Sequence, residues 1–342
     1  MPVTDSTSAP ELSFVVETLN LRDAHDFTPL DTALRAMHAQ SIDRSRFEII
    51  VVVDPSAEPE LAGHLEANWP DVRVLEVPPG THYYAMKNAG AVAARGAVVG
   101  YVDADCQPAP SWAESMCEAL LRSDAPPSFA VGAYDTPRSL ESWLARAFLV
   151  TIFANQIGRA ARQTNSIAAS NSAVLRERIV AEPFRDDPFF HGPDVEMATR
   201  ILGRGEQIVL VPGARNIHDH EPGLASQHGR GVYWGYCFLR LRLEGSPEVK
   251  YAKLFRRLGP LAPLAVVPAK ALIDVRHLLE RRRDLEAGAG ATLAVAGLLV
   301  LNALSVSLGA MRYYAGLPPP RQPQNTRFSG TRRATDPTDL TD

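Results

Sequence analysis

The chain has 342 residues, of which 46% are hydrophobic and 22% charged, and its formal net charge is −4. This composition is typical of a globular protein with a substantial core and excludes a largely disordered chain. The weakly negative charge gives no electrostatic reason to expect nucleic acid as a partner. The three cysteines form no closely spaced pair, which argues for a reducing compartment and against a disulfide or zinc framework.

The two ends of the chain differ in composition from its middle. Residues 1–10 are polar and lack the basic and apolar pattern of a secretory signal, and residues 317–342 are rich in Pro, Arg and Thr. We expect both segments to be disordered tails.

Apolar strands alternate with helices between residues 11 and 102. The predicted strands cover residues 13–16, 47–53, 72–77 and 97–102. The predicted helices begin at Thr28, as an N-cap before Pro29, and then cover 58–68 and 83–95. Strands this apolar must be covered on both faces, so the pattern predicts an α/β fold with a mostly parallel central sheet flanked by helices.

Aspartates follow two of these strands. Asp54 comes directly after the second strand, and Asp103 and Asp105 follow the fourth. Ligands of parallel sheets bind beyond the carboxyl ends of the strands, so the pair could hold a divalent cation that neutralises a diphosphate. The alternatives are an acidic strand end without a ligand for the pair, and a helix N-cap or turn for Asp54. A glycine-rich dinucleotide fingerprint and a P-loop are both absent from the sequence, which argues against nicotinamide dehydrogenases and P-loop enzymes.

The following segment is expected to form a substrate platform. A capping box at Ser111 predicts a helix to Arg122, followed by a strand over 129–134 and a long apolar helix over 140–157. Next come a polar segment over 163–172, a short helix over 174–180, and a loop over 184–195 that is rich in Asp, Pro and His. A helix over 196–202 and a strand over 207–211 complete it.

Two apolar stretches near the C-terminus could contact a bilayer. Residues 287–311 carry no charge and are long enough to cross it, whereas 258–269 are shorter and contain three prolines. Arginines flank the longer stretch on both sides, so a single span conflicts with the positive-inside rule. Three arrangements remain: a hairpin that crosses, two helices in the membrane interface, and a buried helical pair of a soluble protein.

In order and spacing, these motifs resemble family-2 glycosyltransferases, which are inverting enzymes with the GT-A fold. The likeness covers residues 13 to about 235. It rests on the opening strand and turn over 14–20, the strand 48–53 with Asp54, the segment Lys87-Asn88-Ala89-Gly90, and Asp103-Ala104-Asp105. It continues through residues 168–174, through 191–196, where the family usually has Glu-Asp, and loosely through 227–231.

This resemblance implies a role for particular residues. Asp105, Asp103 and, more weakly, His218 would bind Mg²⁺ or Mn²⁺, and Asp194 would be the catalytic base. The residues expected to bind the nucleotide-sugar are Thr18, Asn20, Asp54, Asn88, Asp103 and Arg230.

Other assignments stay open at these positions. Asp194 could cap the helix that follows it, with Phe189 and Phe190 as neighbours that raise its pKa by desolvation. Asp186, Asp187 and Glu196 are weaker candidates for the base. His218 and His220 could form a surface pair, Arg230 a surface ion pair, and Asn88 a backbone turn.

Lys87 is expected to be solvated. The sequence departs from the family at Glu17, where proline is common, which we interpret as a subfamily trait without catalytic cost. It departs again at Pro193, where glutamate usually precedes the base.

The expected organisation has three parts between the tails. Residues 11–107 would bind the nucleotide-sugar, 108–245 the acceptor, and 246–316 would form a membrane-associated helical region. The expected activity is inverting transfer of a sugar from a nucleoside diphosphate to a lipid or polysaccharide acceptor at the cytoplasmic face of the membrane. The alternatives are a degenerate sugar-nucleotide-binding membrane scaffold and a nucleotidyltransferase, although the latter would be expected to have a Gly-rich basic loop after the first strand.

Overall fold

The computed structural model describes residues 9–21, 26–135, 143–185, 192–218, 223–245 and 248–320. A mixed sheet of nine strands forms the centre of this part, in the order β3-β2-β1-β4-β8-β6-β9-β5, with β7 added on β9. The strands are β1 (Leu12–Glu17), β2 (Phe47–Val53), β3 (Arg73–Glu76), β4 (Val98–Asp103), β5 (Cys106–Pro108), β6 (Phe129–Asp135), β7 (Arg162–Thr164), β8 (Asn171–Leu175) and β9 (Ile208–His218). The first four are mutually parallel, and β8 joins them by pairing antiparallel with β4.

Helices cover both faces of the sheet. The helices of the α/β part are α1 (Thr28–His38), α2 (Leu61–Asn68), α3 (Tyr83–Ala93), α4 (Trp112–Leu121), α5 (Trp143–Phe153), α6 (Arg176–Ala181) and α7 (Pro193–Gly203). Side chains of α1, α2 and α4 pack in one apolar cluster with one face of the parallel strands, and those of α3, α6 and α7 pack with the other. Alternate residues of a strand point to opposite faces, which is why these strands are mostly apolar on both faces, as the sequence indicated.

The four N-terminal strands and the α/β class are therefore confirmed, while several boundaries were wrong. The first helix has Phe27 at its N-cap position, and Thr28 lies inside it. The second helix begins at Leu61, three residues later than expected, because the Glu58 carboxylate lies at the strand ends and interacts with Thr18 and the backbone of Asp54. The Ser111 hydroxyl makes no capping bond, since it donates to the carbonyl of Gly213 on the neighbouring strand.

The second half contains more sheet than the sequence indicated. Residues 171–175 form β8, although a helix was expected from Val174. They form a strand because an edge of β4 is available there, which no local pattern reveals. The last strand, β9, continues past the expected end at Val211 to His218, with an irregularity opposite Gly132 and Ala133 of β6. That extension brings His218 opposite Cys106 on β5.

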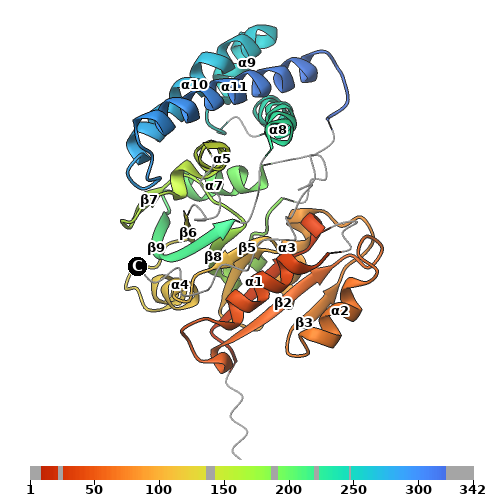
Figure 1. Ribbon diagram of the computed structural model, residues 1–342. Helices are drawn as coiled ribbons and strands as arrows, with labels where there is room; N and C mark the ends of the chain where they lie inside the picture. The colour runs from red at the N-terminus through yellow and green to blue at the C-terminus, as the bar shows by residue number, and fades with distance from the viewer. Residues whose placement is uncertain are drawn as a thin grey trace, which may run out of the picture.

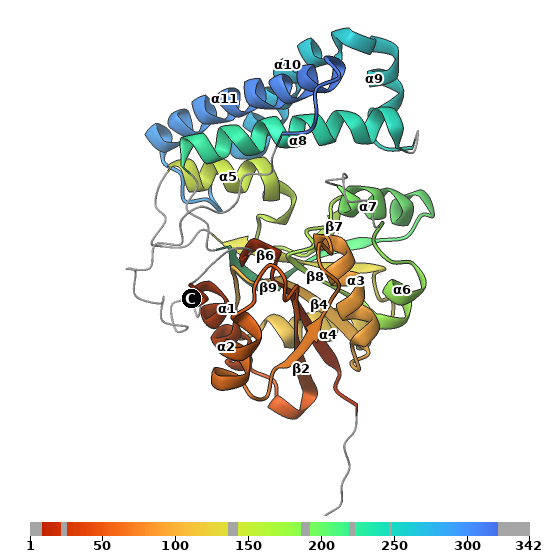
Figure 2. The ribbon, with the colours of Figure 1, turned by 90° about the vertical axis from the view of Figure 1, so that its right-hand side faces the viewer.

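A separate layer of helices covers one end of the α/β part. It comprises α8 (Leu224–Glu244), α9 (Ala252–Leu258), α10 (Ala262–Arg281) and α11 (Ala289–Tyr314). Figure 2 shows α8, α10 and α11 running side by side, with α5 between them and the sheet. Side chains of α5 pack against α10 and α11 in one cluster, so the layer is joined to the domain by apolar contacts. Both Ala252–Arg281 and Ala289–Tyr314 are long and apolar enough to cross a membrane, which by itself is weak evidence.

One buried contact orders the core beneath β4. Trp112 of α4 is fully buried against Phe14, and its indole N–H donates to Oδ1 of Asn171 at 2.7 Å. Gly100 of β4 leaves room for this ring, because a Cβ there would lie 2.8 Å from it. The contact ties α4, β1, β4 and β8 together.

Replacing Trp112 with Phe is expected to destabilise the fold, because it leaves the buried Asn171 oxygen without its donor. The expected loss is about 1–3 kcal/mol in the free energy of unfolding, measured by urea denaturation. Trp143→Phe is the matched control, since that side chain is 55% exposed and should change stability little. Equal effects of the two substitutions would contradict the assigned role of the Trp112–Asn171 bond.

Candidate active site

The candidate site lies where β1, β2 and β4 end and where β9 returns beside them (Figure 1). Asp103 is the last residue of β4, and Asp105 follows it in a tight turn before β5. Both carboxylates are buried, with exposed fractions of 5% and 1%. Buried carboxylates need compensating partners, and the two have different ones.

Asp103 is held by residues from helix α3. Tyr83 donates its hydroxyl to the Asp103 carboxylate at 2.9 Å, and Lys87 Nζ lies 2.7 Å from Oδ1. Lys87 is fully buried and also lies over the Tyr83 ring, 4.6 Å from its centroid. The expectation that Lys87 is solvated was therefore wrong. Lys87 follows Tyr83 by four residues, so both side chains lie on the same face of an apolar helix. This spacing was the feature of the sequence that could have indicated its burial.

Asp105 belongs to a second cluster, formed with Cys106 and His218. One ligand atom from each of these three residues lies within 4.8 Å of the others, so the group could hold a metal ion. His218 Nε2 is 3.9 Å from Asp105 Oδ1, and the ring lies among Phe148, Phe153 and Tyr134. Burial raises the pKa of Asp105, while His218 acts in the opposite direction.

Arg230 approaches Asp105 from α8, in the helical layer. Its guanidinium interacts electrostatically with Asp105 and lies over the Phe148 ring, 5.6 Å from the centroid. Burial lowers the pKa of this guanidinium. The helical layer thus places a positive charge near Asp105. The alternative that Arg230 forms a surface ion pair was wrong.

Asp194 lies in the first turn of α7. That helix begins at Pro193 after Gly192, so Asp194 is not its N-cap. The carboxylate accepts the backbone N–H of Val195 at 2.9 Å and the hydroxyl of Tyr84. Burial raises the pKa of Asp194, and these two hydrogen bonds partly offset the rise.

Two neighbouring tyrosines of α3 connect Asp194 with Asp103. The rings of Tyr83 and Tyr84 meet edge to face with centroids 4.8 Å apart, and each hydroxyl binds one of the two carboxylates. The sequence interpretation missed both tyrosines. The other candidates for the base, Asp186 and Asp187, lie outside the described residues, as do Phe189, Phe190 and His220. Glu196 forms an ion pair with Arg200 one turn later.

The residues expected to bind nucleotide have structural partners as well. Asp54 accepts the backbone N–H groups of Ser56 and Gly80, so the turn alternative describes its present contacts. Thr18 lies 2.9 Å from the carbonyl oxygen of Val52 and 3.0 Å from Glu58 Oε2. Asn88 exchanges hydrogen bonds with the backbone of Phe184, at 2.8 and 3.1 Å. The side chain of Asn20 lies outside the described part of the chain.

Glu17 is a fourth buried acid at the strand ends, and its role was not anticipated. It ends β1 directly opposite Asp103 and is fully buried. Burial, then the neighbouring Asp103, raise its pKa well above the usual range.

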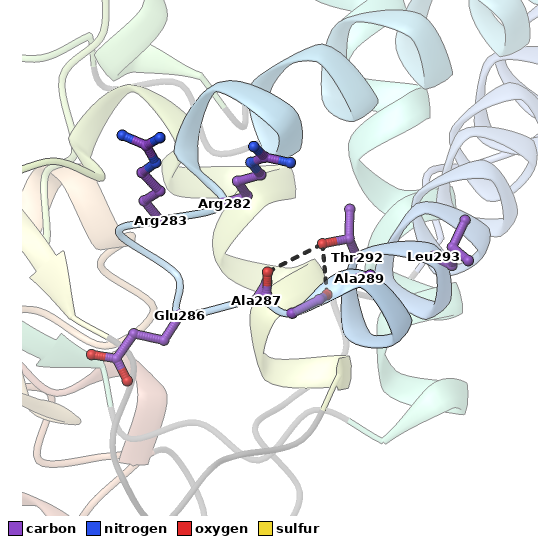
Figure 3. Close-up of a pocket in the computed structure, with 8 residues that line it drawn as sticks. Arg282, Arg283, Glu286, Ala287, Ala289, Thr292 and Leu293 are labelled. Atoms are coloured by element: carbon purple, nitrogen blue, oxygen red, sulfur yellow. Dashed lines mark hydrogen bonds between the residues drawn. The ribbon is translucent and has the colours of Figure 1, made fainter.

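A pocket of about 600 Å³ lies at the turn between α10 and α11, away from these carboxylates. Figure 3 shows Arg282 and Arg283 projecting from the end of α10, with Glu286 directed away from them. Thr292 and Leu293 line it from the start of α11. It holds none of the predicted site residues.

Part of the chain is similar in sequence to known glycosyltransferases. Residues 24–182 match the model of the family described as glycosyl transferase family 2. A curated relative, the pre-mycofactocin glycosyltransferase of Mycobacterium tuberculosis, is 24% identical over 192 residues, which are 55% of this chain and 40% of the relative. The chain thus matches less than half the length of that relative.

A solved mannosyltransferase structure shares the fold. The mannosyltransferase PcManGT from Pyrobaculum calidifontis, in complex with GDP-Man and Mn²⁺, aligns over 90% of this chain and 88% of its own, with a TM-score of 0.52 and 18% identity. GalNAc-T7 with UDP, GalNAc and Mn²⁺ aligns over 73% of this chain and 54% of its own, with a TM-score of 0.49 and 17% identity. Residues 24–182 are thus similar to glycosyl transferase family 2, and the chain shares the fold of PcManGT.

Proposed function

We propose that this enzyme transfers a sugar, with inversion, from a nucleoside-diphosphate donor to a lipid-linked or polysaccharide acceptor at a membrane surface. The observation that carries the proposal is the joining of two clusters. Asp105 and His218 form a candidate metal group at the strand ends, while Asp194 is connected to Asp103 through Tyr84 and Tyr83. The leaving group and the attacking hydroxyl would then be served by different carboxylates of one site.

The donor atoms fit Mn²⁺ or Mg²⁺. A carboxylate oxygen of Asp105 and an imidazole nitrogen of His218 suit Mn²⁺, and Mg²⁺ would depend more on oxygen from Asp105 and Asp103. Burial raises the pKa of the Cys106 thiol well above its usual range, so it stays protonated and is a poor ligand for such hard cations. A cation bound there would neutralise the diphosphate of the donor, as complexes of PcManGT with GDP-Man and Mn²⁺ suggest by analogy.

The remaining donor contacts would come from residues around the strand ends. Arg230 carries a planar cation that suits a phosphate, and it already lies near Asp105. Asp54 would reach the base or ribose from β2, and Thr18, Asn20 and Asn88 would line the same edge. Asp103 would hold the ribose or the metal.

Asp194 would act as the general base. The carboxylate must be ionised to accept the proton of the acceptor hydroxyl, and a raised pKa makes it a stronger acceptor. The Tyr84 hydroxyl orients the carboxylate and stabilises its charged form. Pro193, at the start of α7, places Asp194 in the first helical turn without needing the glutamate usual in the family.

The C-terminal helices would lie in the membrane interface. Leucines on one face of α11 are exposed (Leu293, Leu301, Leu304 and Leu308), while Asn302, Ser305 and Ser307 on its other side are buried. Exposed leucines of α10, including Leu264 and Leu272, continue the apolar surface. The buried side of α11 also carries Val295, Leu299, Val306 and Ala310, so the helix packs on the protein with that side and would offer its exposed leucines to the membrane interface.

The packing of α8 argues against a spanning hairpin. Gly235 of α8 and Gly309 of α11 meet the other helix so closely that an added Cβ would lie 1.9 Å from its backbone. His228 of α8 lies 2.8 Å from the hydroxyl of Ser305 in α11, so a transverse α11 would draw this part of α8, with the neighbouring Arg230, toward the hydrocarbon. Exposed Lys253, Arg257, Arg282 and Arg283 would meet the anionic lipids of a cytoplasmic leaflet.

Asp105→Ala should reduce sugar transfer or donor hydrolysis at least about 100-fold, because the leaving diphosphate loses several kcal/mol of charge stabilisation. The assay uses purified protein, Mn²⁺ and a panel of nucleotide-sugars. Asp124→Ala, which changes an exposed carboxylate between α4 and β6, serves as the control. Wild-type turnover in Asp105→Ala would show that the metal assignment is wrong.

The pH profile tests Asp194. A base with a raised pKa loses its ionised form as the pH falls through that pKa, so kcat/KM should decline on the acidic side above the usual range of aspartate. Tyr84→Phe removes a hydrogen bond to the charged form, so the acidic limb should move to higher pH by on the order of one unit.

Two variants control this experiment. Tyr251→Phe changes an exposed ring and should leave the limb in place. Asp194→Asn should abolish turnover while donor binding, measured by calorimetry, persists. An unchanged limb in Tyr84→Phe together with full activity of Asp194→Asn would assign the base elsewhere.

Membrane contact can be measured by sedimentation with anionic vesicles. Replacing Leu264, Leu272, Leu301 and Leu304 with Ser should weaken partitioning at least about 100-fold, since four half-exposed leucines lose their lipid contacts. The paired change of exposed Leu121 and Leu202 in the α/β part to Ser is the control. Labelling of a cysteine introduced at Glu286 only from the opposite side of the bilayer would instead establish a spanning hairpin.

A further inference from the structure

Glu17, Asp103 and Lys87 form a buried group with more acids than bases. Glu17 and Asp103 are directly paired residues on neighbouring parallel strands, so their side chains leave the sheet on the same face. That face is covered by α3, as the contact of Gly90 with Val15, two residues before Glu17, shows. Lys87 of α3 lies in this layer, bound to Asp103 and electrostatically attracted to Glu17.

Only one of the two oxygens of Glu17 makes a hydrogen bond within the described part of the structure. Its Oε2 accepts the backbone N–H of Leu19 at 2.8 Å. Its Oε1 is fully buried and makes no hydrogen bond to any residue in the described part of the structure. A buried oxygen without a donor is costly and is therefore unusual enough to require an explanation.

Both oxygens of Asp103, in contrast, accept hydrogen bonds. Tyr83 contacts both of its oxygens, and Lys87 binds Oδ1 at 2.7 Å. If Asp103 turns to a donor, as the proposed function requires, Lys87 loses its anionic partner while still buried. A buried ammonium without a partner is strongly disfavoured. Asp103 can therefore bind a ligand only if Lys87 finds another anionic partner.

We infer that Glu17 is a positioning residue that receives Lys87 when Asp103 engages the nucleoside-diphosphate donor. This inference rests on the proposed function. The unused Oε1 of Glu17 supplies the second acceptor for the ammonium group, so that Asp103 is released without leaving a buried charge alone. Lys87 changes partner between two carboxyl groups of adjacent strands, and no covalent bond is made or broken. Proline, the residue common here in the family, offers no such acceptor.

The inference is tested by a double-mutant cycle on nucleotide binding. Calorimetry measures the affinity of the full-length protein for UDP and GDP in the presence of Mn²⁺. Glu17→Gln keeps the size of the side chain but lacks the charge, and it should weaken binding on the order of tenfold. In the Lys87→Met background no ammonium needs a second partner, so Glu17→Gln should then change the affinity less than about twofold.

The outcomes separate this inference from the proposed function. If the wild-type protein binds neither UDP nor GDP, with or without Mn²⁺, the proposed function fails. If it binds one of them and Glu17→Gln costs the same in both backgrounds, Glu17 does not act through Lys87. A purely structural role would lower thermal stability of the unliganded protein without this coupling.

A crystal structure provides a second test that does not depend on the folding of Lys87→Met. With the nucleotide and Mn²⁺ bound to the wild-type protein, Lys87 Nζ should lie about 3 Å from Glu17 Oε1. If Lys87 remains on Asp103 alone in that complex, the inference is overturned.

Discussion

The compensation of buried negative charge organises this protein. Several acids, among them Glu17, Asp103 and Asp105, are buried at the carboxyl ends of adjacent strands or just beyond them. Each would be unstable there alone, so the surrounding elements supply cations and donors: Lys87 and Tyr83 from α3, and Arg230 from α8. The sheet and its helices keep these groups buried and close together, and electrostatic interactions between buried groups are stronger than in water.

The need to compensate buried negative charge also links the C-terminal helices to the candidate site. Arg230 reaches Asp105 from a helix that also packs along α11, and Phe148 of α5 lies between this guanidinium and His218. Helices α5, α10 and α11 share an apolar cluster, so the proposed membrane layer and the strand ends are parts of one packed body. An acceptor that arrives along a lipid surface would therefore meet the site at the layer that helps to build it.

The order of strands and helices in the first hundred residues could be predicted because the local sequence pattern there matches the burial of each element in the folded protein. The run from Phe47 to Val53 is apolar except for Glu48, and its bounds as a strand match the prediction. The second half was harder. Residues 171–175 contain Asn and Ser and join the sheet only because β4 presents a free edge, and β9 extends to His218 through pairing with β5 and β6. The Ser111 hydroxyl donates to the carbonyl of Gly213 instead of capping its helix, and Thr28 lies inside its helix after Phe27.

The sequence by itself determined the α/β class and the acidic residues at the strand ends, because both follow from short-range periodicity and from where charge interrupts apolar runs. The family resemblance added the expected roles of Asp105 and Asp194. Only the tertiary structure decided which groups meet. It buried Lys87 against Asp103, placed His218 and Arg230 beside Asp105, joined Asp194 to Tyr84, and left one oxygen of Glu17 without a donor. These contacts link residues far apart in the chain, and their energies depend on burial, which no local pattern of residues contains.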